Sequence, residues 1–207
     1  MTNDERREKG LAYFADEEIY GQLAECRKRL KVVNELDRWE YDKINLAMKD
    51  VIPNSEKLFI VPPFYCEFGT RIKLGNNFYA NYNCVILDVA PVTIGENCMF
   101  GPNVSIYTAG HPVHPKTRNT GYEYGKPITI GDNCWIGGSV TITPGVTIGD
   151  NVVIGAGSVV TRDIPDNVVA VGNPCRVIRE ITDKDRRYLH KDELIDDEIW
   201  DKIKDDV

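Results

Sequence analysis

Aliphatic residues recur at every sixth position through much of the second half of the chain. The unbroken run consists of Ile130, Ile136, Ile142, Ile148, Ile154 and Val160, and the same spacing is kept upstream by Ile94, Phe100 and Ile106. No helix has a period of six residues, and an array of hairpins would show turn residues every eight to twelve positions. If each hexad forms one short strand and one corner, three hexads close a triangular coil, and stacked coils bury the aliphatic column. The pattern therefore predicts an all-β core built as a prism of parallel coils.

Short internal repeats support the same prism. The segment TIGEN returns twice as TIGDN, at 129–133 and 147–151, and glycine after the inward residue suits a corner where the backbone needs unusual dihedral angles. Cys98, Cys134 and Val152 hold the same place in their hexads, so we expect them to form one inward-facing column. A disulfide between the two cysteines is geometrically conceivable, but in a reducing compartment we expect two packed thiols.

Two amphipathic helices are predicted ahead of the prism. Between positions 16 and 51 the apolar residues are spaced by three and four, as one face of a helix requires; they are Ile19, Leu23, Cys26, Leu30 and Val33, then Tyr41, Ile44, Met48 and Val51. From residue 183 onward, charged residues alternate with apolar ones and predict a charged C-terminal helix with one apolar edge. We therefore divide the chain into an N-terminal helical segment (1–58), the prism (59–182) and a C-terminal helical tail (183–207).

The prism pattern has one long interruption. Ile94 and Ile130 are separated by the length of two coils, yet only one coil of hexads lies between them, so residues 108–127 are predicted to leave the prism as a loop. Long loops in compact repeat folds are commonly functional. This loop carries His111 and His114, and an imidazole can take a proton from a hydroxyl near neutral pH. Its position favours function for His111, and a histidine that only hydrogen-bonds a loop carbonyl is the alternative.

Charge and composition argue against several classes of protein. The 207-residue chain is 42% hydrophobic and 28% charged, and its net charge of −7 disfavours a general binder of nucleic acid or of anionic membranes. The N-terminus has no secretion signal, and nowhere do eighteen apolar residues run together, so we expect a cytoplasmic protein. The six cysteines include no C-x-x-C pair, which gives a zinc ribbon no support, and we predict no metal site.

Longer motifs carry a more specific signal. They are NNFYANYN at 76–83, TAGHPVHP at 108–115, KPITIGDNCWIGG at 126–138, TPGVTIGDNVVIGAGSVVTRDIP at 143–165 and GNPCRVIRE at 172–180. Together they resemble the maltose and galactoside O-acetyltransferase family of hexapeptide-repeat acyltransferases, and KGLAYFADEEIYGQLAECRKRL at 9–30 is similar to the family's N-terminal helical segment. The resemblance implies a left-handed parallel β-helix in a homotrimer whose active sites lie between subunits. It also implies transfer of acetyl from acetyl-CoA to a sugar hydroxyl, without a metal.

The resemblance also implies a catalytic set. His111 matches the family's catalytic histidine and would take the proton of the acceptor hydroxyl while the oxygen attacks the thioester. Gly138 would supply a backbone N–H for the oxyanion, and Asn81 matches an asparagine near the reacting centre, where it would hold acceptor or thioester. Glu123 is our candidate for orienting the imidazole. The alternative for Asn81 is an asparagine that only stacks within a coil, and the alternative for Glu123 is an exposed loop glutamate.

Coenzyme binding is implied along one part of the prism. Trp135 would pack along the pantetheine arm near Gly138, backbone groups of Ala156 and Thr161 would meet it, and three arginines would face the phosphates. These arginines are Arg162, Arg176 and Arg179. In an acidic protein they would form the local basic cluster that a phosphate-bearing partner needs, although a solvated rim with salt bridges is the alternative for any one of them.

The acceptor pocket follows from the same resemblance. Asp16 aligns with a family aspartate that holds sugar hydroxyls, and it is also a natural N-cap for the helix that follows. At Glu67 galactoside-type members commonly carry Ser and maltose-type members Asp, and Asp88 lies in LDVAP, which resembles the maltose-type sequence. Asn81 would complete this pocket, and Glu67 and Asp88 favour the maltose type, with an acceptor such as maltose or glucose.

Other functions stay open at this point. An acetyl-CoA-dependent enzyme could use a non-sugar acceptor, such as a drug hydroxyl or an amine, and a noncatalytic β-helix scaffold would need the hexads alone. A hexapeptide-repeat carbonic anhydrase would need three histidines on zinc, and the sequence offers no third ligand beside His111 and His114.

Overall fold

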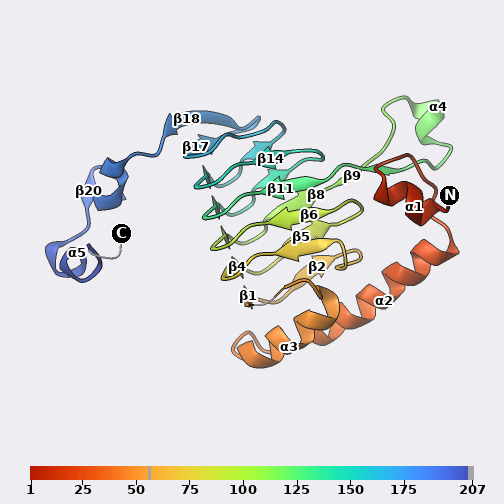
Figure 1. Ribbon diagram of the computed structural model, residues 1–207, viewed down its shortest axis with the longest axis horizontal. Helices are drawn as coiled ribbons and strands as arrows, with labels where there is room; N and C mark the ends of the chain where they lie inside the picture. The colour runs from red at the N-terminus through yellow and green to blue at the C-terminus, as the bar shows by residue number, and fades with distance from the viewer. Residues whose placement is uncertain (56, 205–207) are drawn as a thin grey trace.

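The computed structural model describes residues 1–55 and 57–204 (Figure 1). Three helices precede the prism: α1 (Asn3–Glu8), α2 (Glu17–Asn34) and α3 (Tyr41–Val51). The second and third confirm the two predicted amphipathic helices, whereas α1 was not expected from the sequence. Within the described part of the chain, no helix is both long enough and apolar enough to cross a membrane.

The prism has three walls of short strands. The first wall runs through β1 (Leu58–Ile60), β4 (Phe78–Ala80), β7 (Met99–Phe100), β12 (Trp135–Ile136), β15 (Val153–Ile154), β17 (Val168–Val171) and β18 (Arg176–Glu180). The second runs through β2 (Phe64–Cys66), β5 (Cys84–Leu87), β8 (Ser105–Tyr107), β13 (Thr141–Ile142) and β16 (Val159–Val160). The third runs through β3 (Ile72–Leu74), β6 (Val92–Ile94), β11 (Ile128–Ile130) and β14 (Thr147–Ile148). Within the walls all pairs are parallel except β17 with β18, which are antiparallel.

The strand register confirms the six-residue spacing. Ile94 pairs with Ile130 in the third wall, and Phe100 pairs with Ile136 in the first wall. All four side chains are buried on the axis of the prism. Since the side-chain period of a strand is two, the outward neighbours of these residues form the walls' outer surface.

One corner of the prism carries a ladder of asparagines. Their side chains donate and accept hydrogen bonds of 2.9–3.1 Å from coil to coil, and their φ angles lie between +55° and +59°; they are Asn77, Asn97, Asn133, Asn151 and Asn167. Asparagine tolerates the left-handed region better than most residues, and its amide can both donate and accept. Directly after the ladder positions lie Cys98 and Cys134, which are buried free thiols, as expected.

The α2–α3 pair closes the open end of the first coil. The buried faces of α2 and α3 pack on β2 and β1, and Figure 1 shows the two helices below the lowest strands. The side chain of Asn34, at the end of α2, holds the β2 backbone through two hydrogen bonds to Phe64, each of 2.9 Å. The helices therefore cover an end of the core that the repeat itself would leave open.

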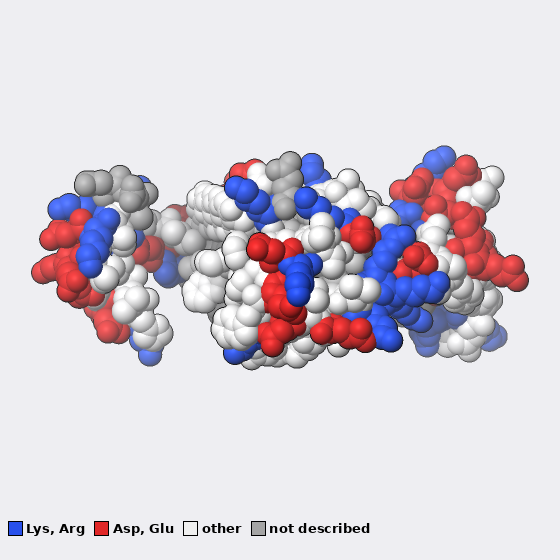
Figure 2. All heavy atoms as spheres, turned by 90° about the horizontal axis from the view of Figure 1, so that it is seen from below, with Lys and Arg blue, Asp and Glu red and all other residues white. Residues whose placement is uncertain are grey.

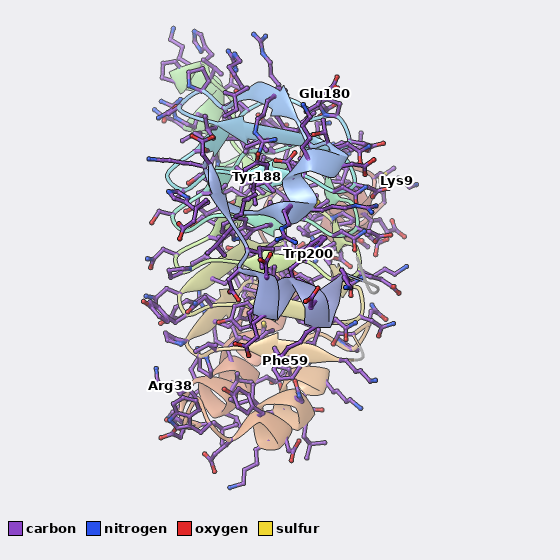
Figure 3. All side chains as sticks on the ribbon, turned by 90° about the vertical axis from the view of Figure 1, so that its left-hand side faces the viewer. Lys9, Arg38, Phe59, Glu180, Tyr188 and Trp200 are labelled. Carbon is purple, nitrogen blue, oxygen red and sulfur yellow. The ribbon has the colours of Figure 1, made fainter. Side chains whose placement is uncertain are left out.

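The C-terminal tail is only partly helical. The expected helix is present as the short α5 (Asp197–Ile203), but the preceding residues form a 3-10 helix, η1 (Asp183–Arg187), and a hairpin of β19 (Tyr188–His190) and β20 (Glu193–Leu194). The tail is therefore not one continuous helix from residue 183, because the chain reverses at Lys191, whose φ of +50° no right-handed helix allows. Figures 1 and 3 show the tail beside the prism, with Tyr188 and Trp200 on it.

Candidate functional site

The predicted excursion loop is present and rises on a short stem. Thr108 is buried where the chain leaves β8, and its hydroxyl bridges two backbone groups of the neighbouring coil at 2.6 and 2.9 Å. The next residues form β9 (Ala109–Gly110), which pairs antiparallel with β10 (Tyr124–Gly125) as the loop returns. His111 follows directly after β9, so the stem determines where this residue leaves the prism.

The stem can pack this closely only with glycine. A Cβ atom on Gly110 would lie 2.6 Å from the ring of Tyr124, and one on Gly125 would lie 2.8 Å from the Cβ of Ala90. Both distances are far below a van der Waals contact, so a side chain at 110 would displace the ring of Tyr124, and one at 125 would push β10 away from Ala90. The glycine before His111 in TAGHPVHP therefore has a structural reason.

The tip of the loop carries both histidines on its surface. His111 and His114 are exposed, and His114 is the N-cap residue of α4 (Pro115–Arg118). The guanidinium of Arg118 donates to the two carbonyls that follow His111, at 3.2 and 2.9 Å, which holds the turn after it. Over residues 1–55 and 57–204, neither imidazole has a hydrogen-bond or ion-pair partner. His111 is thus free to meet a group that another molecule brings.

The loop is fastened to the N-terminal segment by a residue that the sequence did not single out. The hydroxyl of Tyr13 donates to Glu123 Oε2 at 2.8 Å, and the backbones of the two residues exchange two hydrogen bonds of 3.0 Å. Tyr13 is 2% exposed, and burial together with the bond to Glu123 raises the pKa of this phenol. Beside it, the rings of Phe14 and Tyr122 lie 4.4 Å apart. In one chain Glu123 is therefore held by Tyr13, and its orientation of His111 stays a prediction.

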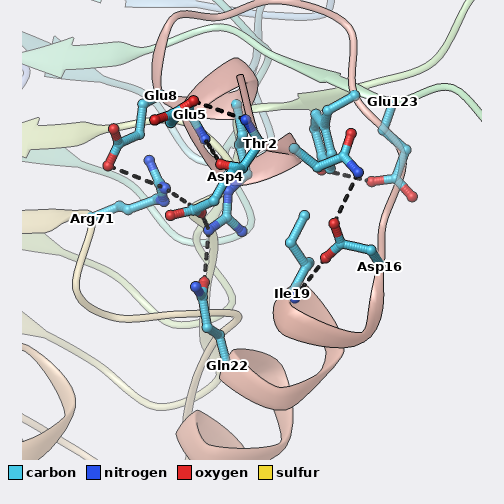
Figure 4. Close-up of polar contacts among 12 residues, drawn as sticks. Thr2, Asp4, Glu5, Glu8, Asp16, Ile19, Gln22, Arg71 and Glu123 are labelled. Carbon is cyan, nitrogen blue, oxygen red and sulfur yellow. Dashed lines mark hydrogen bonds and ion pairs between the residues drawn. The ribbon is translucent and has the colours of Figure 1, made fainter.

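Asp16 has the capping role that the sequence predicted. It is the N-cap of α2, and its Oδ1 accepts a hydrogen bond of 3.1 Å from the N–H of Ile19. Its other oxygen accepts one of 2.8 Å from the amide of Asn3 (Figure 4). These two bonds, that from Asn3 first, lower the pKa of Asp16, so the carboxylate is ionised at neutral pH.

Two further carboxylates gather near Tyr13. Asp88 is fully buried, and its Oδ1 accepts from the N–H groups of Glu67 and Phe68 at 3.0 and 2.9 Å. Burial raises the pKa of Asp88, and its Oδ2 has no partner within the described residues. Burial, followed by the charges of Asp88 and Glu123, raises the pKa of Glu67. Asp88 thus shapes the backbone that carries Glu67, and direct contact of either residue with an acceptor stays a prediction.

Asn81 and Gly138 occupy a different corner of the prism from the loop. Asn81 follows β4 and Gly138 closely follows β12, so both lie where first-wall strands end, whereas His111 lies beyond the end of a second-wall strand. Asn81 is not part of the asparagine ladder, and its Oδ1 accepts from its neighbour's N–H at 2.8 Å. The N–H of Gly138 donates no backbone hydrogen bond to any described residue. A single chain therefore does not bring these three predicted residues together.

Three of the predicted coenzyme residues follow one edge of the prism. Trp135 is 55% exposed on the outer face of the first wall, between Met99 and Val153 in the neighbouring strands. Ala156 lies one coil beyond Gly138, because its neighbour Gly157 donates to the carbonyl of Gly138 at 2.9 Å. An exposed aromatic surface and free backbone groups thus lie in a row along this edge.

The remaining predicted coenzyme residues lie toward the last coil, but one of the three phosphate-binding arginines is already engaged. Thr161 and Arg162 are exposed just after β16, and Arg176 is exposed at the start of β18. The guanidinium of Arg179 instead binds both carboxylate oxygens of Asp185 in the tail, at 2.8 and 3.0 Å. Arg179 would have to exchange this carboxylate for a phosphate in order to bind a coenzyme.

The described residues contain no group of three or more His, Cys, Asp or Glu side chains placed to hold a metal ion. The third histidine, His190, lies in the tail hairpin. The structure thus adds no support to the zinc alternative.

The chain matches known proteins over most of its length. Residues 91–113 and 127–162 match the family described as the hexapeptide repeat of succinyl-transferase, and residues 114–126 of the excursion loop lie outside the matched ranges. The galactoside O-acetyltransferase of Escherichia coli (strain K12) is 51% identical over 161 residues, which cover 77% of this chain and 79% of that protein.

Two solved structures share the fold closely. A maltose O-acetyltransferase from Clostridium difficile 630 is 49% identical with a TM-score of 0.86, covering 88% of this chain and 99% of that one. A galactoside acetyltransferase solved in complex with coenzyme A is 44% identical with a TM-score of 0.87, covering 95% of this chain and 99% of that one. These similarities confirm the left-handed parallel β-helix with its N-terminal helices.

Proposed function

Because the chain belongs to the galactoside and maltose O-acetyltransferase family of hexapeptide-repeat proteins, we propose that it acetylates a hydroxyl of a sugar such as maltose or glucose, with acetyl-CoA as the donor and His111 as the general base. The observation that carries the proposal is the placement of His111. It stands exposed on a glycine-built stem, without a partner among the described residues. A histidine with a structural role would be expected to hydrogen-bond its own loop.

The proposed active site needs a second copy of the chain. His111 lies at one corner of the prism, and Asn81 and Gly138 lie at another, so the set is completed when the loop of one subunit reaches the neighbouring prism. We therefore place the active sites between the subunits of a homotrimer. The prism, residues 59–182, would supply the catalytic surfaces, and the segment 1–58 would hold the loop through Tyr13.

The reaction follows from the chemistry of these groups. The imidazole of His111 takes the proton of the acceptor hydroxyl as its oxygen attacks the thioester carbonyl. The N–H of Gly138 donates to the oxyanion that develops there, and the amide of Asn81 holds the acceptor or the thioester. When the carbon–sulfur bond breaks, the thiolate of coenzyme A leaves and receives the proton that the imidazole carries. The acetyl group is then an ester on the sugar, and His111 is neutral again.

The two substrates would reach this centre from opposite sides. Acetyl-CoA would lie along the edge marked by Trp135 and Ala156, and its phosphates would meet Arg162, Arg176 and, after release from Asp185, Arg179. The sugar would enter beside Tyr13, where Asp16 and Glu67 offer carboxylate oxygens to its hydroxyls. A relative in the family has been solved in complex with coenzyme A, which supports the choice of donor.

Release of free CoA thiol from acetyl-CoA tests the proposal. The acceptors are maltose, glucose, a β-galactoside, chloramphenicol and an amine, and His114→Ala serves as the matched control for His111→Ala. We expect a sugar-dependent rate that falls about 10²- to 10⁴-fold in His111→Ala and changes little in His114→Ala. An equal rate in His111→Ala and the unsubstituted protein would contradict the role of His111. Thiol release with a non-sugar acceptor alone would contradict the sugar and identify another acceptor class. Failure of the protein to bind CoA would favour a noncatalytic scaffold.

A further inference from the structure

A cavity separate from the proposed active site lies between the N-terminal helices and the third wall. Its volume is about 840 Å³, and no residue of the excursion loop lines it. Its lining comes from α1, α2, β3 and the turns beside them, and it includes the side chains of Arg7, Gln22, Arg29, Phe68, Arg71 and Lys73. The proposed acetyl transfer uses none of these residues.

Arg7 is a buried cation with incomplete hydrogen bonding. Its side chain is 1% exposed, and its Nη2 donates to Asp4 Oδ1 and, at 2.8 Å, to Gln22 Oε1. Its Nε and Nη1 have no partner among the described residues. The guanidinium carbon lies 3.9 Å from the ring centroid of Phe68, which offsets part of the lost hydration. A buried charge with unmet donors is unfavourable, and proteins usually pair it.

A second guanidinium shares the same carboxylate. Arg71 is 12% exposed, and its Nη2 donates to Asp4 Oδ1 at 3.1 Å and lies 3.9 Å from Glu8 (Figure 4). Burial, followed by the positive charge of Arg7, lowers the pKa of Arg71. The two cations therefore repel each other across one aspartate, and a further negative charge would relieve that repulsion.

The rim of the cavity adds positive charge in an otherwise acidic protein. Lys73 is exposed at the rim and has no ion pair within residues 1–55 and 57–204. Arg29 of α2 also lines the cavity, although its guanidinium contacts Glu25 at 3.6 Å and a backbone carbonyl at 3.0 Å. Figure 2, which views the molecule from below, shows Lys and Arg side chains gathered in a band over α2, while Asp and Glu dominate the N-terminal end.

We propose that this cavity is a second binding site, at which Arg7 and Arg71 hold the phosphate or carboxylate group of a small molecule. Guanidinium groups form forked hydrogen bonds to such oxyanions, and the Asp4 carboxylate already occupies one position between the two. A phosphate group carries close to two negative charges at neutral pH, so it compensates Arg7 and Lys73 better than a carboxylate does. The site therefore binds phosphate more tightly than acetate.

Calorimetric titration of inorganic phosphate and of acetate, at constant ionic strength, tests the site. The protein is first saturated with CoA, so that the arginines proposed to bind the coenzyme do not add a second phosphate signal. We expect phosphate to bind, and Arg7→Met to weaken its binding by at least about tenfold. The matched control is Arg6→Met, since Arg6 is the adjacent arginine and, among residues 1–55 and 57–204, its guanidinium hydrogen-bonds only the carbonyl of Ala12.

Several outcomes would overturn the site. They are the absence of phosphate binding to the unsubstituted protein, equal binding by Arg7→Met, and an equal loss in Arg6→Met, which would indicate a general effect of charge. Thermal unfolding reports whether Arg7→Met is folded, and in that variant the Asp4 carboxylate keeps its ion pair with Arg71. If that variant does not fold, Arg71→Gln replaces it, with the same tenfold loss expected. Because no step uses CoA chemistry, the result is independent of the proposed transferase activity.

Discussion

The Tyr13 hydroxyl links the N-terminal segment to a carboxylate of the excursion loop, and Tyr13→Phe removes this hydrogen bond without changing the ring. The bond to Glu123 is 2.8 Å long, its donor is 2% exposed and its acceptor is a half-buried carboxylate. Hydrogen bonds to charged groups contribute about 1.5–3 kcal/mol, and the exposed side of Glu123 can recruit water when the phenol is absent. We therefore expect Tyr13→Phe to lower the free energy of unfolding by about 1–2 kcal/mol at pH 7.

The same pair predicts how this difference changes with pH. Tyr13 has a raised pKa in the folded chain and an ordinary value of about 10 when unfolded. Its contribution is therefore complete below pH 10 and is lost as the pH rises above it, by about 1.4 kcal/mol per pH unit. Phenylalanine has no such proton, so the gap between the two proteins should nearly close at pH 11. The buried thiols Cys66 and Cys84 also have raised pKa values, but they are common to both proteins and cancel in the difference.

Urea unfolding at pH 7 and pH 11, followed by tryptophan fluorescence, measures this gap. A gap below about 0.3 kcal/mol at pH 7 would mean that the hydrogen bond does not fasten the loop. A gap that stays constant between the two pH values would refute the raised pKa of Tyr13. Thiol release measured in parallel should fall for Tyr13→Phe if the loop positions His111, as we propose.

Three shorter predictions concern other residues. Burial and neighbouring carboxylates raise the pKa of Glu67, so its charge destabilises the fold at pH values above about 4.3, the pKa of glutamate in the unfolded chain. Glu67→Gln should therefore raise the melting temperature at pH 7, and this gain should vanish near pH 4. A Cβ atom on Gly131 would lie 2.1 Å from Asp150 Oδ1 and 2.8 Å from the Gly149 backbone, so Gly131→Ala should destabilise the protein by about 2–4 kcal/mol in urea unfolding. At Gly21 nothing lies within 4 Å of the new atom, so Gly21→Ala should instead stabilise the protein by up to about 1 kcal/mol. Asp185→Asn should free Arg179 and strengthen CoA binding up to about fivefold in calorimetry, and weaker binding would show that the ion pair assists the coenzyme.

The prism could be predicted because its information is local and repeated. Each hexad specifies its own strand and corner, so the pairing of Ile94 with Ile130 follows from counting residues, and the apolar spacing that predicts α2 is equally local. The glycine-flanked departure of His111 was visible for the same reason, because it interrupts a regular pattern.

The remaining features depend on contacts between distant segments. Nothing in the composition of residues 9–30 shows that the Tyr13 hydroxyl meets Glu123, 110 positions later in the chain. The burial of Arg7 against Phe68 is likewise absent from any periodic pattern, because α1 is too short to display one. In the tail, alternation of charged and apolar residues fits a hairpin as well as a helix, and the turn at Lys191 decided between them.

The antiparallel stem at residues 109–110 and 124–125 separates the packing of the prism from the placement of His111. Below the stem, β8 and β11 each continue their own wall in the register of the coil before, whatever lies between them. The length and content of the segment above can therefore change without disturbing a single inward side chain. A change in this one interval of the gene can therefore alter the surroundings of His111 while the strands of the prism keep their pairing.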